Sequence, residues 1–122
     1  MRPFFIFTTE PGFKTVLSTL ETFVLALVFL GKPTAGFYGL RMLLLNSLGI
    51  LCDELGILKK LKAEGLIRKT EGYNYGLTPA GFMFLKQIDL EAIRSHLLNE
   101  TKNSELLTAV LAKVAERRAA EP

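Results

Sequence analysis

Residue types that carry enzyme or metal chemistry are scarce in this chain, which has one cysteine and one histidine among 122 residues. A single cysteine, Cys52, can form neither an intramolecular disulfide nor a zinc site of several thiolates. It is also typical of a reducing, cytoplasmic setting. The sequence also shows no paired-carboxylate constellation, no glycine-rich phosphate loop after a strand, and no nucleophile–base pairing beyond Cys52 and the lone His96, which lie far apart. We therefore expect neither an enzyme nor a protein that holds a metal or cofactor.

The sequence also lacks a long apolar run. The longest one, Phe23–Leu30, has eight residues, whereas a membrane-spanning helix needs about 20. The chain is nevertheless 49% hydrophobic, with a mean hydropathy of +0.29. Because a small protein exposes much of its apolar surface, we expect a partner chain, rather than a membrane, to cover part of it.

The positive charge is small overall but concentrated. Fifteen Lys and Arg against twelve Asp and Glu give a net charge of +3. Residues 1–88 hold ten basic and six acidic side chains, a balance of +4, whereas residues 89–122 hold five and six, a balance of −1. Within residues 59–69 five side chains are basic and one is acidic. Such a local excess favours a polyanionic partner, although a charge run is also typical of a solvated face.

Apolar spacing and capping residues predict a mostly helical first half. We expect an N-terminal arm over residues 1–14, in which Phe4–Phe7 is a short edge strand or packs on a partner chain. A first helix is expected to begin after Gly12 and to end at Gly31, and a second to span Phe37–Leu45.

A third helix is expected from a cap at Asn46-Ser47 to Glu64, with Gly65 as its stop. Fusion of the second and third helices is the alternative, because little separates them. The third helix should bury one stripe of leucines, which are Leu51, Leu55, Leu58 and Leu61.

The second half alternates turn signals with short apolar segments. Residues 66–70 and 73–77 predict a β-hairpin, followed by a helix over Ala80–Ile88 that Thr78 caps with Pro79 at its first position. Asp89 and Asn103-Ser104 predict the caps of two further amphipathic helices, and residues 116–122 are expected to be frayed.

Helices followed by a hairpin and a further helix are the element order of a winged helix-turn-helix. Leu58–Ile67 is similar to the LxxLxxxGLI motif that closes the recognition helix and enters the first wing strand. Tyr75–Gly81 is similar to the YxLTxxG motif that leaves the wing. Leu25–Leu27, with Gly31, Pro33 and Gly36-Phe37, further resembles the opening of PadR-like transcriptional regulators.

This resemblance covers Phe23 to Leu85. It implies an α+β, mostly helical chain: the arm (1–14), a winged-helix DNA-binding domain with a two-stranded wing (15–88), and a C-terminal helical dimerisation extension (89–122) with a frayed end. The implied function is that of a homodimeric transcriptional regulator, a repressor that binds duplex DNA at an inverted repeat.

The candidate DNA contacts follow from this architecture. On a helical wheel centred on Leu58, the outward face of the third helix, which includes Ala63, is small and polar, so we expect it to enter a major groove. The expected contacts from the recognition helix are Asn46, Ser47, Gly49, Asp53, Gly56, Lys59 and Lys60. Those from the wing and its flanks are Arg68, Lys69, Tyr73 and Asn74. Of Tyr73 and Tyr75, one should face the helices.

The apolar stripes of the last two helices are the expected dimer interface. Their residues are Leu90, Ile93, Leu97, Leu107, Val110, Leu111 and Val114. Three roles stay open. Cys52 is either a half-buried thiol or an oxidation sensor, His96 is solvated or at an interface, and a small-ligand pocket beside the C-terminal helices is not visible in the sequence.

Two other functions compete with a repressor. The same dimer suits a plasmid, phage or replication-associated DNA-binding protein that acts in partition, termination or copy control. A winged-helix module that binds protein and not DNA is favoured by the acidic pair Asp53-Glu54 and by the absence of arginine between Asn46 and Gly56.

Overall fold

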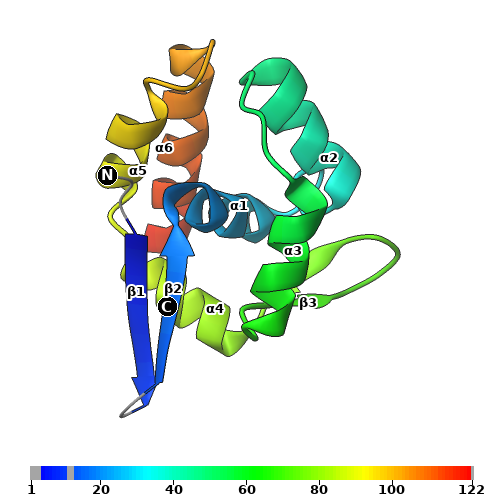
Figure 1. The fold of residues 1–122 in the computed structure, drawn as a ribbon, viewed down its shortest axis with the longest axis vertical. Coiled ribbons are helices and arrows are strands. Elements are labelled where there is room, and N and C mark those ends of the chain that lie inside the picture. Colours follow the sequence, from blue (N-terminus) through cyan, green and yellow to red (C-terminus); the bar gives the residue numbers. More distant parts are fainter. Residues whose placement is uncertain (1–3, 11–12, 122) are drawn as a thin grey trace.

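A computed structural model gives the fold and describes residues 4–10 and 13–121. Its strands are β1 (Phe4–Glu10), β2 (Phe13–Ser18), β3 (Ile67–Lys69) and β4 (Tyr75–Leu77). Its helices are α1 (Thr19–Leu30), α2 (Phe37–Arg41), the π-helix η1 (Met42–Ser47), α3 (Glu54–Ala63), α4 (Pro79–Lys86), α5 (Leu90–Leu97) and α6 (Ser104–Ala120). β1 pairs with β2 and β3 with β4, each pair antiparallel. The described chain is thus α+β and mostly helical, as expected (Figure 1).

Helix α1 lies at the centre of the molecule. It has α5 and α6 on one side and α3 with the β3–β4 hairpin on the other (Figure 1). Six consecutive side chains, Phe23 to Val28, are at most 2% exposed. Since six residues exceed one and a half helical turns, α1 is buried around its whole circumference.

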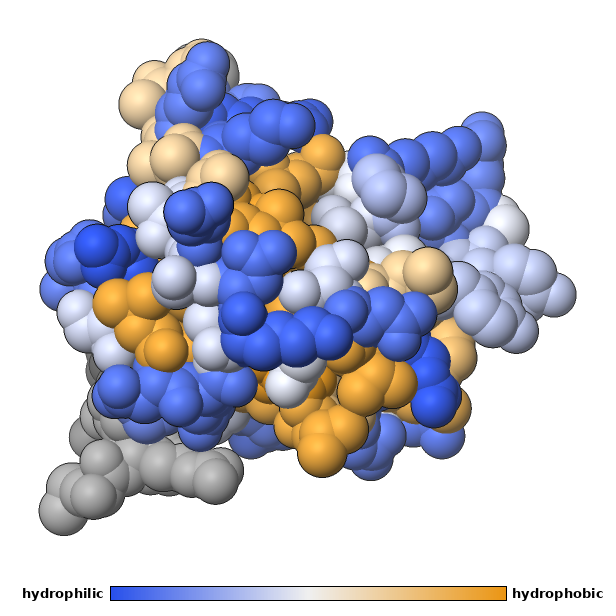
Figure 2. Space-filling view, turned by 90° about the horizontal axis from the view of Figure 1, so that it is seen from above, coloured by the Kyte–Doolittle hydropathy of each residue, from blue (hydrophilic) through white to orange (hydrophobic). Residues whose placement is uncertain are grey.

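The longest apolar run of the sequence is therefore largely covered by the chain itself. On the face of the molecule seen from above, the apolar side chains that remain at the surface form separate patches between hydrophilic side chains (Figure 2).

The segment before α1 is a β-hairpin, so the helix expected after Gly12 begins later. Phe4 pairs with Ser18 and Thr8 with Lys14, which confirms a strand at Phe4–Phe7. Residues 1–3, 11 and 12 of the expected arm lie outside the described residues. Val16 is 42% exposed and its neighbour Leu17 is 0% exposed, as expected for alternate faces of a strand rather than for a helix.

Ser18 sets the start of α1 through a capping box. Its hydroxyl accepts a hydrogen bond from the backbone N–H of Glu21 at 3.2 Å, and the Glu21 carboxylate accepts one from the backbone N–H of Ser18 at 2.9 Å. These bonds satisfy N–H groups at the helix start. Gly31, with a φ of +83°, ends the helix as expected.

The expected second helix is present but half of it is a π-helix. The chain is helical from Phe37 to Ser47, and in η1 the backbone N–H of Leu48 donates to the carbonyl of Leu43 at 2.8 Å. The third helix does not begin at Asn46-Ser47 and is not fused to the second. Residues 48–53 form an irregular loop before it.

Asp53 is the residue that caps α3, because its carboxylate accepts a hydrogen bond from the backbone N–H of Gly56 at 3.0 Å. Of the expected leucine stripe, Leu58 and Leu61 are buried. Leu51 and Leu55 are 82% and 44% exposed, because Leu51 lies in the loop and the helix starts seven residues later than expected.

The β3–β4 hairpin and α4 confirm the expectations for residues 66–88. Ile67 pairs with Leu77 and Lys69 with Tyr75. The Thr78 hydroxyl accepts a hydrogen bond from the backbone N–H of Gly81 and caps α4. A backbone hydrogen bond of 2.7 Å from Tyr75 to Ala35 anchors the hairpin to the turn between α1 and α2.

Helices α5 and α6 begin at the expected caps, Asp89 and Asn103, but they belong to the same hydrophobic core as α1. No second core divides the described chain at residue 88. The residues expected to pair two protomers are instead packed inside one chain. Leu90, Ile93, Leu97, Leu107, Leu111 and Val114 are at most 9% exposed, and Val110 is partly buried against the same core.

α6 continues as a helix to Ala120, through most of the segment that is expected to be frayed, and two of its arginines contact other elements; Pro122 lies outside the described residues. Arg117 donates to the carbonyl of Leu30 at 2.6 Å, at the end of α1. Arg118 donates to the carbonyls of Leu85 at 3.0 Å and Ile88 at 2.8 Å, at the end of α4. The last carbonyls of a helix lack intrahelical hydrogen-bond donors, and the guanidinium groups of Arg117 and Arg118 donate hydrogen bonds to carbonyls at these helix ends.

We expect Arg118→Met to lower the free energy of unfolding by about 1–3 kcal/mol, because two carbonyls lose a charged donor. Urea titration followed by circular dichroism measures the change. Arg94→Met is the matched control, since Arg94 makes only a long contact of 3.7 Å to the exposed Glu91, and it should cost less than about 0.5 kcal/mol. Equal costs for the two variants would contradict the assignment.

Candidate nucleic-acid interface

Three of the exposed side chains of α3 form one stripe. Leu55, Lys59 and Lys62 are all exposed and are spaced by four and three residues, which places them on one face of a helix. Lys60 and Ala63 are exposed beside them, and Leu58 and Leu61 are fully buried on another face of α3. We call Leu55, Lys59 and Lys62 the α3 stripe. It presents one apolar side chain and two ammonium groups to solvent.

Four of the expected recognition residues do not lie on this stripe, because they precede or begin α3. Asn46 and Ser47 are exposed at the end of η1, where the Asn46 amide contacts the sulfur of Met42 at 3.0 Å. Gly49 has a φ of +70°, and a Cβ there would touch the Lys102 side chain, so it faces the segment before α6. Asp53 is occupied as the cap of α3.

Of the outward face expected for the third helix, Lys60 and Ala63 are exposed and Gly56 is partly buried, whereas Gly49 precedes α3 and does not belong to the helix. A Cβ at Gly56 would meet the Asp53 carboxylate. Lys60 forms an ion pair of 2.9 Å with Glu21 of α1, in which the side chains are 42% and 17% exposed. Of the expected recognition residues, Lys59 is the one on the α3 stripe.

The ion pair joins α3 to the capping box of α1. The same carboxylate oxygen of Glu21 accepts from the Lys60 ammonium and from the backbone N–H of Ser18. Burial raises the pKa of Glu21, but the hydrogen bonds from Lys60 and Ser18 and the charge of Lys60 outweigh it, so the pKa lies below its ordinary value of 4.5. Glu21 thus stays charged at neutral pH, and Lys60 is a structural residue.

The two acidic residues at the start of α3 differ in exposure. Glu54 is only 6% exposed, whereas Asp53 is exposed and accepts the hydrogen bond that caps the helix. Of the acidic pair that favoured a protein partner over DNA, Glu54 is therefore withdrawn from the surface and Asp53 remains at the start of α3.

The β3–β4 hairpin adds further cations next to α3. Arg68 and Lys69 are exposed, and Tyr73 in the turn is 78% exposed. The loop after β3 projects from the body of the molecule on the same side of α1 as α3 (Figure 1). These three residues stand where a wing would contact the backbone of a duplex.

Asn74 and Tyr75, in contrast, are structural. Asn74 is half-buried, forms a β-bridge with Gly36 and donates from its amide to the carbonyl of Glu71 at 3.3 Å. Tyr75 packs against the core, so it is the tyrosine that faces the helices, as expected of one of the pair.

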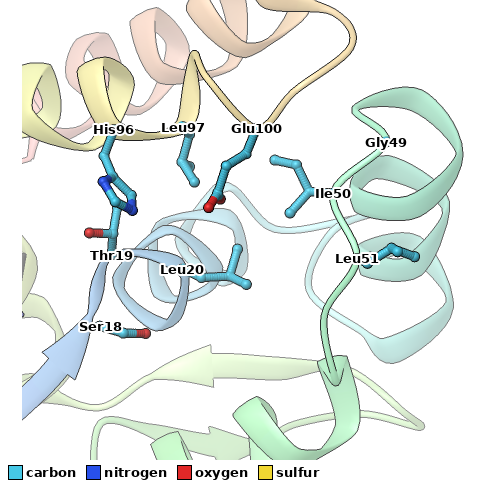
Figure 3. Close-up of a pocket in the computed structure, with 9 residues that line it drawn as sticks. All are labelled: Ser18, Thr19, Leu20, Gly49, Ile50, Leu51, His96, Leu97 and Glu100. Carbon is cyan, nitrogen blue, oxygen red and sulfur yellow. The ribbon is translucent and has the colours of Figure 1, made fainter. Parts of the chain in front are cut away.

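His96 does not belong to this surface and lines a cavity of about 200 Å³ between the start of α1 and the end of α5. Its imidazole and the Glu100 carboxylate point toward α1 there (Figure 3). Ser18, the nearby hydroxyl, is already engaged in the capping box. Among the described residues no three His, Cys, Asp or Glu side chains could hold a metal ion together.

Cys52 is half-buried in the loop before α3. Burial and then the charges of Glu54 and Asp53 raise the pKa of its thiol from 9.0 to about 11. A reactive sensor cysteine needs a lowered pKa, so the structure favours the unreactive thiol.

Comparison with protein families, with curated proteins and with solved structures found no match for this chain. Within the described residues, the helices are too short and not apolar enough for any of them to cross a membrane. The α3 stripe and the adjacent β3–β4 hairpin therefore form the candidate functional site.

We expect Glu21→Gln to lower stability by about 0.5–1 kcal/mol at pH 7, because glutamine keeps the capping acceptor and loses only the charge. Since the pKa of Glu21 is lowered in the folded chain, the charge stabilises above pH 4.5, and this contribution disappears as the pH falls through the lowered pKa. Denaturant titrations at pH 7 and pH 3 test this, and Glu21→Gln in a Lys60→Met background is the control. A cost that is the same at both pH values would contradict the ion pair.

We expect Cys52 to react with iodoacetamide about 100-fold more slowly in the folded chain than in the unfolded chain at pH 7.5. The reason is the smaller thiolate fraction at a pKa of about 11 than at 9.0. Mass spectrometry follows the reaction, with the same chain in guanidinium chloride as reference. Equal rates would restore the sensor role.

Proposed function

We propose that this chain is a winged-helix protein that binds duplex DNA, with α3 in the major groove and the β3–β4 hairpin as the wing on flanking backbone. The element order from α1 to α4 supports this arrangement, as does the resemblance of residues 23–85 to PadR-like regulators. The backbone bond that anchors Tyr75 to Ala35 fixes the hairpin beside the helices.

The observation that carries the proposal is a set of four cations on two adjacent elements, α3 and β3, without an ion-pair partner among the described residues. Lys59 and Lys62 on the α3 stripe, and Arg68 and Lys69 on β3, are exposed. The ion pairs among the described residues join Lys60 to Glu21 and Arg94 to Glu91, so none involves these four. Free cations on a helix and an adjacent wing suit contacts with phosphates.

Leu55 gives the α3 stripe an apolar group beside its two lysines. It is 44% exposed on the outward face of α3, and an apolar side chain in the major groove contacts the methyl group of thymine. We assign base contact to Leu55 and phosphate contact to the cations.

We further propose a homodimer that acts as a transcriptional repressor on an inverted repeat, because two-fold pairing would place two recognition helices about one DNA turn apart. The dimer cannot use the stripes of α5 and α6 as first expected, since these pack on α1. The interface of the proposed homodimer must lie on another part of the molecular surface.

A protein-binding module is the second candidate, and exposed apolar residues favour it. Tyr38, Met42 and Leu51 are 73%, 58% and 82% exposed. Together with Leu55 they lie in the segment that runs from α2 through η1 to α3. Exposed apolar residues of this size, where they are contiguous, mark protein interfaces. In that case the chain would not bind DNA.

The test is a titration of fluorescent random duplex at 50 mM and 200 mM salt. The wild-type chain should bind, and its affinity should fall steeply with salt. Lys59→Glu with Lys62→Glu should weaken binding at least tenfold and reduce the salt slope by about 2. Lys113→Glu, which changes the charge on α6 beyond α1, is the matched control and should leave both values unchanged.

Two results would overturn DNA binding by this face. The first is an absence of binding to the fluorescent duplex at 50 mM salt. The second is equal affinity of the wild type and the double variant, with circular dichroism showing that both are folded.

A further inference from the structure

An apolar groove of about 540 Å³ lies where α6 passes the end of α1 and η1. It is lined by Leu30 at the end of α1, Leu43 in η1 and Val110 in α6, together with Lys32 and Lys113. Its volume is within the range of about 300–1,000 Å³ that is typical of small-molecule sites.

The apolar residues of this groove are incompletely covered. Leu30, Leu43 and Val110 pack against the core and remain partly exposed. They come from three segments that meet at this point, so the groove is formed by tertiary packing and not by one helix.

The groove is cationic at its edge. Lys32 and Lys113 are exposed, and among the described residues neither has an ion-pair partner. Arg117 is held by its hydrogen bond to the Leu30 carbonyl and stacks over the Phe29 ring, 5.4 Å from its centroid. With Glu116 as the one carboxylate in the lining, the groove carries a net charge of +2.

We propose that this groove binds an amphipathic organic anion, a carboxylate with an aliphatic or aromatic body. The apolar body would cover Leu30, Leu43 and Val110, and the carboxylate would pair with the ammonium groups of Lys32 and Lys113. A neutral apolar molecule would leave the two lysines unpaired, and an inorganic anion would leave the apolar wall in water. The inference does not depend on DNA binding.

The experiment is a titration of the ¹⁵N-labelled full chain with octanoate, followed by two-dimensional NMR. We expect saturable shift changes at Lys32, Leu43, Val110 and Lys113. Lys32→Glu with Lys113→Glu should weaken octanoate binding at least tenfold. Lys102→Glu, a lysine before α6 and outside the groove lining, should leave the affinity unchanged.

Two further experiments separate the contribution of charge to octanoate binding from that of apolar contact. Octanol has the same chain without the carboxylate and should bind the wild type at least tenfold more weakly than octanoate. Val110→Trp should fill the groove and abolish octanoate binding while both lysines remain, and the dispersion of its amide spectrum reports whether it is folded.

The proposal is overturned by any of four results. They are the absence of saturable shifts with octanoate, equal affinity of the wild type and the double-charge variant, equal affinity for octanoate and octanol, and shifts centred on the His96 cavity instead of the groove.

Discussion

The structure depends on the burial of α1 on all sides. A helix whose every face is apolar must be surrounded, and six consecutive residues from Phe23 to Val28 are buried here by contacts with α3, α4, α5, α6 and the β4 strand. This requirement explains why a short chain that is 49% hydrophobic contains so many helices around one core. It also explains why the stripes of α5 and α6 are used within the chain.

Both ends of α1 are tied to other elements by polar contacts, and these contacts orient the candidate interface. At its start, Glu21 binds Ser18 and Lys60, which holds α3 against α1. At its end, the Leu30 carbonyl binds Arg117 of α6. The rotation of α3 that buries Leu58 and Leu61 pairs Lys60 with Glu21 and leaves Lys59 and Lys62 exposed without an ion-pair partner among the described residues.

Elements with local signals could be predicted from the sequence, and those set by distant contacts could not. Gly31, Thr78-Pro79, Asp89 and Asn103 mark helix ends through their own backbone and side-chain bonds, and each prediction is confirmed. Ser18-x-x-Glu21 is a capping-box signature that could have placed the start of α1. The apolar stripes of α5 and α6, in contrast, have the same sequence pattern whether they pack on α1 or on another protomer.

The candidate site was harder to predict because the face of a helix depends on its start and on its neighbours. Successive residues are separated by about 100° on a helix, so Lys59 and Lys60 point in clearly different directions. The sequence cannot show that Lys60 has a partner 39 residues away, and this partner decides which lysine remains free. The β3–β4 hairpin could be predicted because Gly72, with a φ of +60°, and the paired strands are local features. The bridge of Asn74 to Gly36 could not, since it is a tertiary contact.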